Sequence, residues 1–233
     1  MSFSAGEKHV ACVIAASAAG RLAPPFLVVA GKNAMSGWVE PIGHDLSSCD
    51  PAVRMLSERD WLDGDAAICT SPKGSMEMSL IHPVIDYVQK FFRKFVPPTE
   101  PLLALLDGHT SRSGLRWLMK AEKNLIEVAK IPSDASHFLQ PCDDTINESF
   151  QRSVGKIRDS LVAACRGIGA GTPQFKLARA SCALRSMTAN DIIKSFQSTG
   201  MWPMNCRFLD RFRTPRQQVI NEACEESQQS PVA

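Results

Sequence analysis

The segment that most constrains the fold is a run of five apolar residues, Leu102–Leu106, which ends directly in Asp107 and Gly108. A short run that is apolar at every position, and not only at alternate ones, is typical of a strand buried on both faces. Such a strand needs cover on both sides of its sheet, and ligands of α/β proteins bind beyond the carboxyl ends of strands. The run therefore predicts an α/β domain with Asp107 in a crevice at the edge of a sheet.

The remaining pattern supplies partners for this strand. Two short apolar runs, residues 9–16 and 26–30, are separated by Ala19-Gly20-Arg21 and predict an antiparallel hairpin. Residues 31–75 are rich in Gly, Ser, Asp and Pro, so we expect irregular connections there with one or two short elements. Apolar spacing predicts helices over residues 77–96, 114–123, 175–184 and 188–197, and a further strand over residues 125–131.

A long helix is predicted after Pro141. Asp144 or Thr145 would begin it, and Glu148 follows Thr145 at the spacing of a capping box. Its apolar stripe consists of Ile146, Phe150, Val154, Ile157 and Leu161. Trp117 and Trp202 are expected in the core and not as platforms for nucleic-acid bases.

Composition narrows the class of protein. The 233 residues carry 26 basic and 24 acidic side chains, so any nucleic-acid-binding surface must be local. The eight cysteines form no C-x-x-C pair and are expected to be reduced thiols. No signal peptide, membrane-spanning run or nucleotide-binding motif is present, which favours a nuclear or cytoplasmic protein, not secreted, without a membrane or small-molecule partner.

Two acids are the candidate functional residues. Asp107 follows the apolar strand, and Asp143 stands near the start of the long helix. Each has a structural alternative, because turn acids cap backbone amides and acids at helix starts complement the helix dipole. If the two carboxylates meet, they form a hard oxygen site suited to Mg²⁺ or Mn²⁺. His109 and His137 would then orient an acid or contact substrate, or make only local hydrogen bonds.

Four segments resemble one known family. Residues 18–28 (AAGRLAPPFLV), 106–111 (LDGHTS), 131–143 (IPSDASHFLQPCD) and 193–205 (IKSFQSTGMWPMN) are similar, in this order, to motifs of the DDE superfamily endonucleases. The pogo, Tigger and Jerky-like branch of the mariner transposases is the nearest pattern. The resemblance implies a ribonuclease H-like fold, a mixed sheet flanked by helices. It also implies that Asp107 and Asp143 are the second and third catalytic acids, that they bind Mg²⁺ or Mn²⁺, and that DNA is the partner.

The chain also departs from the family pattern. The family's first acid stands in an N-x-D-E-T strand upstream of the hairpin, and no such motif precedes Glu7; Arg112 stands where the family usually has His. We therefore expect an incomplete domain over residues 1–209 that lacks the first catalytic strand, followed by a polar, disordered tail over residues 210–233. The hairpin edge left without that strand would invite self-association.

The expected function follows from these features. The chain resembles a transposase-derived DNA-binding endonuclease domain whose ancestor cleaved and joined DNA with metal, and which is inactive as it stands. The alternative is a domesticated module that binds DNA or protein without cleavage; a metabolic α/β enzyme is a third hypothesis that no motif supports. Contacts to DNA phosphates are expected from four cations, Arg112, Arg116, Lys120 and Lys123.

Overall fold

The structure is a computed structural model that describes residues 9–40, 54, 56, 62, 66–107, 114–132, 135–164 and 171–205, apart from the side chains of residues 137, 138, 163 and 164. This part of the chain is α/β, as predicted. Its strands are β1 (Val10–Val13), β2 (Phe26–Ala30), β3 (Ala67–Ser71), β4 (Leu102–Leu106) and β5 (Ile126–Lys130). Its α-helices are α2 (Ile81–Phe92), α3 (Leu115–Lys123), α4 (Ser136–Leu139), α5 (Asn147–Ala164), α6 (Pro173–Arg185) and α7 (Ala189–Ser198).

The first sheet has three strands in the order β1-β2-β3. The predicted hairpin is confirmed, because β1 and β2 pair antiparallel with Val10 opposite Val29. β3 pairs parallel with β2, so the prediction of irregular structure over residues 31–75 missed a strand. The sequence of β3, AICTS, contains only two β-branched residues, and its pairing with β2 rather than its own propensity defines it.

β1 is an edge strand within the described part of the chain. The Ala30 amide donates to the His9 carbonyl at 2.9 Å, so odd-numbered residues of this strand exchange hydrogen bonds with β2. Hydrogen-bonded and non-hydrogen-bonded positions alternate in an antiparallel pair. The backbone groups of Val10, Cys12 and Ile14 therefore point away from β2, toward the open edge.

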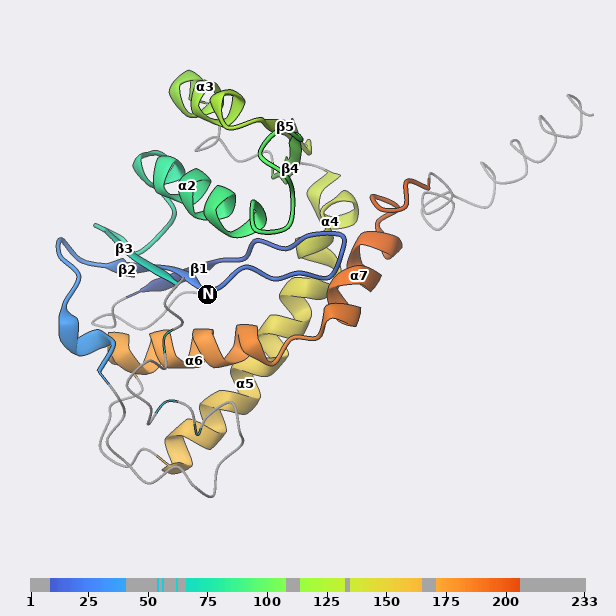
Figure 1. The fold of residues 1–233 in the computed structure, drawn as a ribbon. Coiled ribbons are helices and arrows are strands. Elements are labelled where there is room, and N and C mark those ends of the chain that lie inside the picture. The colour runs from blue at the N-terminus through green and yellow to red at the C-terminus, as the bar shows by residue number, and fades with distance from the viewer. Residues whose placement is uncertain are drawn as a thin grey trace, which may run out of the picture.

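Both faces of the three-stranded sheet are covered by helices (Figure 1). Leu27 and Val29 pack in one cluster with residues of α5 and α6. Phe26 and Val28 point to the opposite face, where Leu80 and Tyr87 at α2 contact them. The alternation of β2 side chains between two buried clusters fixes the register of the central strand, since a shift of one residue would exchange the two faces.

β4 and β5 form a separate, parallel sheet connected by α3. Leu102, Ala104 and Leu106 pack with Trp117 and with the side of α2 that carries Ile81 and Ile85. The prediction that β4 is buried on both faces is wrong for its other face, where Leu103 is 66% exposed. One helix, α2, thus contributes to the cores of both sheets.

The long helix begins differently from the prediction. A π-helical turn, Cys142–Ile146, precedes α5, and the Thr145 hydroxyl donates to Asp144 at 2.8 Å instead of capping the helix. Glu148 accepts from Arg152 at 2.7 Å, one turn further along, so the capping box is not formed. The predicted apolar stripe is confirmed as buried or partly buried, consisting of Ile146, Phe150, Val154, Ile157 and Leu161.

The two predicted core tryptophans have opposite positions. Trp117 is buried between α3 and α2, whereas Trp202 is 62% exposed, so its assignment to the core is wrong. Trp202 lies beyond the C-terminal end of α7, so it is not part of the apolar face of that helix. Among the helices that the structure describes, none is long and apolar enough to cross a bilayer.

Candidate functional site

Asp107 stands where the sequence placed it, immediately after β4. The Ile131 amide donates to the Leu106 carbonyl at 2.8 Å, so the parallel pair of β4 and β5 extends to the residue before Asp107. The Asp107 side chain is partly buried. Its position at the carboxyl end of two parallel strands is one where α/β proteins bind ligands.

Asp143 lies in the π-helical turn that leads into α5. Its side chain is exposed, and one of its oxygens, Oδ1, accepts a hydrogen bond from Asn147 Nδ2 at 2.8 Å. The chain reaches this turn from the end of β5 through α4. Each acid therefore follows the carboxyl end of one of the two parallel strands, Asp107 directly after β4 and Asp143 after β5 and α4. That their carboxylates converge stays a prediction.

The chemistry of these two residues fits a hard divalent cation, since both offer carboxylate oxygens of the kind that Mg²⁺ and Mn²⁺ prefer. Within the described ranges, however, no group of three or more His, Cys, Asp or Glu side chains is placed to hold an ion together. His109 and the side chain of His137 lie outside the described residues. That Asp107 and Asp143 bind a metal ion therefore stays a prediction.

The predicted phosphate-contacting cations differ in their surroundings. Arg116 and Lys123 are exposed on α3. Lys120 instead forms an ion pair with Asp86 of α2, at 2.5 Å, and its ammonium also donates to the His82 carbonyl at 3.3 Å. Arg112 lies outside the described residues. Lys120 therefore connects α3 to α2 through this ion pair. A contact between Lys120 and a DNA phosphate would have to break the ion pair.

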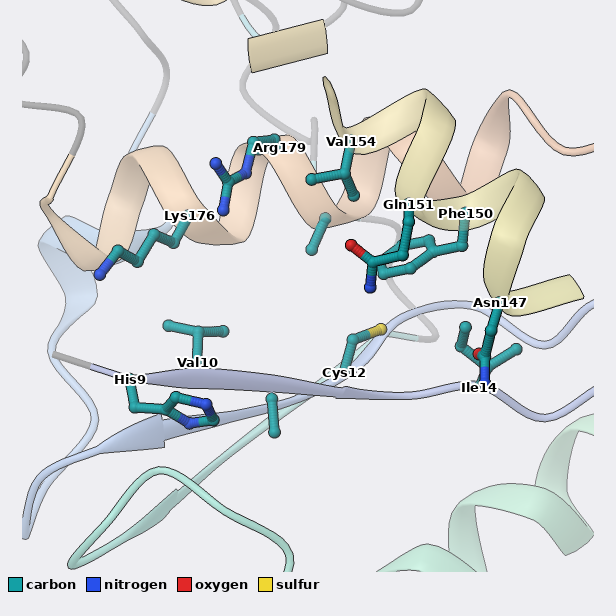
Figure 2. Close-up of a pocket in the computed structure, with 12 residues that line it drawn as sticks. His9, Val10, Cys12, Ile14, Asn147, Phe150, Gln151, Val154, Lys176 and Arg179 are labelled. Carbon is teal, nitrogen blue, oxygen red and sulfur yellow. The ribbon is translucent and has the colours of Figure 1, made fainter. Parts of the chain in front are cut away.

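A cavity of about 340 Å³ that the sequence did not predict lies along the open edge of β1 (Figure 2). Its floor is β1 from His9 to Ile14, and its roof is formed by α5 and α6. Lys176 and Arg179 of α6 reach it at one end, and Asn147 of α5 at the other. Burial raises the pKa of the Cys12 thiol, which points into this space, to about 12.

The cavity is next to the Asp143 turn. Asn147 lines the cavity and donates the hydrogen bond that holds Asp143. The open backbone edge at Val10, Cys12 and Ile14 therefore runs toward the residue that supports this acid. The sequence analysis did not predict this space, because it depends on how α5 and α6 pack over β1.

Comparisons with known proteins indicate the family of this chain. The family described as DDE superfamily endonuclease matches residues 7–163, a range that includes both Asp107 and Asp143. The chain is also 27% identical over 189 residues to the MFS-type transporter clz9 of Cochliobolus lunatus; the match covers 81% of this chain and 18% of that protein. The chain thus spans less than a fifth of that relative's length. No solved structure matches the chain.

Proposed function

The chain belongs to the DDE superfamily endonuclease family, and from this premise we propose that it is a transposase-derived DNA-binding domain of the pogo, Tigger and Jerky-like branch. The observation that carries the proposal is the place of Asp107, inside the matched region and directly after a strand of a parallel pair. In this proposal Asp107 and Asp143 are the second and third acids of a DNA-cleaving site. Nuclear localisation belongs to the same proposal, because DNA is the substrate.

Asp107 and Asp143 would be the protein ligands of Mg²⁺ or Mn²⁺. Bound there, the ion would activate the attacking water and stabilise the leaving oxygen of a phosphodiester. The residues of this chain would contribute the rest: Asp107 is positioned by the end of β4, and the amide of Asn147 holds one oxygen of Asp143. Arg116 and Lys123 would contact phosphates without reading the sequence of the DNA.

The fold we propose is ribonuclease H-like, with one mixed sheet in place of two. A strand that carries the first acid would pair along the open edge of β1 and join it to β4. The outward backbone groups of Val10, Cys12 and Ile14 support this arrangement, and so does the cavity beside them. Without that strand, an open edge favours self-association.

A strand-cleavage assay tests this function. The purified chain is incubated with labelled DNA and Mn²⁺ or Mg²⁺, beside an Asp107→Ala control. We expect salt-sensitive DNA binding but no metal-dependent cleavage above the control, because two of three carboxylates do not hold both ions in the geometry that phosphoryl transfer needs. Cleavage that Asp107→Ala abolishes would show that the chain builds a complete site. Absence of DNA binding would refute the proposal as a whole.

A second candidate function is a domesticated module that binds DNA or a protein without cleaving. The observation that favours it is the incomplete set of metal ligands within the described residues. In that case Asp107→Ala and Asp143→Ala would leave DNA affinity unchanged in the presence and in the absence of Mn²⁺. In a metal-dependent domain, Mn²⁺ would change the affinity of the unsubstituted chain for DNA, and either substitution would remove that change.

A further inference from the structure

Two adjacent acids, Asp143 and Asp144, lie in the π-helical turn before α5, and the structure gives them different surroundings. Asp143 is exposed, whereas Asp144 is partly buried against α7. The sequence alone does not distinguish them, because either carboxylate would be an acceptable ligand for a divalent cation. Their contacts do distinguish them.

Asp144 is engaged by two hydroxyl groups. Thr145 Oγ1 donates to Asp144 Oδ2 at 2.8 Å, and Ser198 Oγ, from the last residue of α7, donates to the same oxygen. The Ser198 hydroxyl also lies 3.0 Å from the Ser195 carbonyl, but it has one proton to donate. Hydrogen bonds to an ionised acceptor are about twice as strong as those to a neutral one, so the carboxylate is the preferred acceptor.

A second serine of α7 holds the other end of the same turn. Ser195 is fully buried, and its hydroxyl donates to the carbonyl of Pro141, the residue that caps the π-helical turn. Ser195 and Ser198 are three positions apart and therefore lie on one face of α7. This face of α7 therefore contacts Pro141, just before the turn, and Asp144, in the middle of the turn.

We infer that Asp144 is a positioning residue, and that it docks α7 onto the acid-bearing turn so that Asp143 alone of the pair is presented to the metal. The role of Asp143 as a metal ligand rests on the proposed function, whereas the docking of α7 by Asp144 does not. The docking occupies the Asp144 Oδ2 atom with two hydrogen bonds. Asp143, in contrast, is exposed, and its Oδ1 accepts a hydrogen bond from Asn147.

Amide hydrogen exchange of the metal-free protein tests the docking. Asp144→Ala and Ser198→Ala should speed exchange over residues 141–147 by about tenfold or more, since each removes a hydrogen bond to a charged group. Asp144→Asn keeps an oxygen acceptor, and Asp143→Asn leaves the dock untouched, so both should exchange within about threefold of the unsubstituted chain. Unchanged exchange in Asp144→Ala and Ser198→Ala would overturn the inference.

Binding of Mn²⁺ alone, followed by its electron paramagnetic resonance signal, tests the assignment of the ligand. Asp143→Asn should weaken Mn²⁺ binding by about tenfold or more, because it removes a carboxylate ligand. Asp144→Asn should weaken it much less, because the variant keeps an oxygen acceptor for the dock. The reverse order would make Asp144 the ligand and overturn the inference. If the unsubstituted chain binds no Mn²⁺, the metal site of the proposed function fails, and the exchange experiment still decides whether Asp144 docks α7.

Discussion

Leu27 in β2 and Leu103 in β4 each occupy the second position of a five-residue apolar strand, yet Leu27 is 0% exposed and Leu103 is 66% exposed. The three-stranded sheet has α2 on one face and α5 with α6 on the other. In the two-stranded sheet, α2 and α3 cover the face that carries Leu102, Ala104 and Leu106. The same kind of sequence therefore has two environments in one molecule.

The difference in burial separates the sheet that contributes most to stability from the sheet that carries a candidate functional residue. Burial on both faces gives the three-stranded sheet most of the apolar contacts that hold the described part of the chain together. The two-stranded sheet is less covered and carries Asp107 at its carboxyl end. Regions with fewer buried contacts open more readily and often hold functional residues.

The largest expected effect separates the two leucines. Leu27→Ala should lower the free energy of unfolding by about 3 kcal/mol, because it leaves a cavity in a fully buried cluster. Leu103→Ala should change it by less than about 0.5 kcal/mol, as at most surface positions. Urea denaturation of the two variants measures both. Equal losses would mean that the Leu103 side chain is covered in solution.

The next prediction concerns Gly74, which follows β3 with φ +67°. A Cβ there would lie 2.3 Å from the His9 carbonyl oxygen and 2.7 Å from the Ala30 nitrogen, so Gly74→Ala should cost about 2 kcal/mol or more. Gly155→Ala is the control, since a Cβ in α5 meets nothing within 4 Å. That substitution should stabilise the protein by about 0.5–1 kcal/mol. A tolerated Gly74→Ala would show that the turn holding β1, β2 and β3 together is not fixed.

Cys12 predicts a pH dependence for the three-stranded sheet. Burial raises the pKa of its thiol from 9.0 to about 12, so the unfolded chain releases this proton first as the pH rises. Below pH 9 the thiol is protonated in both states and has no effect; above it, stability falls until the folded thiol also ionises near pH 12. At pH 10 the loss should be about 1 kcal/mol. Cys12→Ala should remove this part of the decline in the free energy of unfolding, measured by denaturation at pH values from about 8 to 10.5. If the free energy of unfolding falls equally in the variant, the Cys12 thiol is solvated in the folded protein.

The sequence predicted those elements whose signals are local. Periodicity located α2, α3, α5, α6 and α7, and the turn at Gly20 predicted the hairpin. The N-cap of α7 follows the same logic, since Thr188 accepts from the Asp191 amide at 3.2 Å. β3 was missed because pairing with a strand about forty residues earlier stabilises it, and no local pattern reports such a partner.

The site was predictable only in part, for a related reason. Asp107 was found from the apolar run that ends in an acid, and it stands at the end of β4 as expected. The contact of Asp144 with α7 was not predicted, because its donor Ser198 is about fifty residues away and reaches it through the packing of α7. The capping box failed for a local reason: the Thr145 hydroxyl donates to the neighbouring Asp144 carboxylate.

The smallest expected effect concerns the cations around α3. If DNA phosphates contact this helix, Arg116→Gln and Lys123→Gln should each reduce the slope of log affinity against log salt concentration by about one, because each contact releases one counterion. Lys120→Gln should change the slope less, since its ammonium is paired with Asp86 on α2. The affinity is measured by fluorescence anisotropy with a labelled DNA duplex. Salt concentrations from about 50 to 200 mM cover the range in which phosphate contacts dominate the salt dependence.

Asp86→Asn is the matched control for Lys120. It releases the ammonium from its ion pair and should cost less than about 1 kcal/mol of stability, because the pair is partly exposed. The released Lys120 should then contribute to the salt slope, so that Lys120→Gln has a larger effect in the Asp86→Asn background than in the original chain. If Lys120→Gln has the same effect in both backgrounds and matches Arg116→Gln, the ion pair does not hold Lys120 back, and α3 presents all of its described cations to DNA equally. If none of the substitutions changes the slope, DNA does not bind at α3, and the predicted phosphate contacts of this helix are wrong.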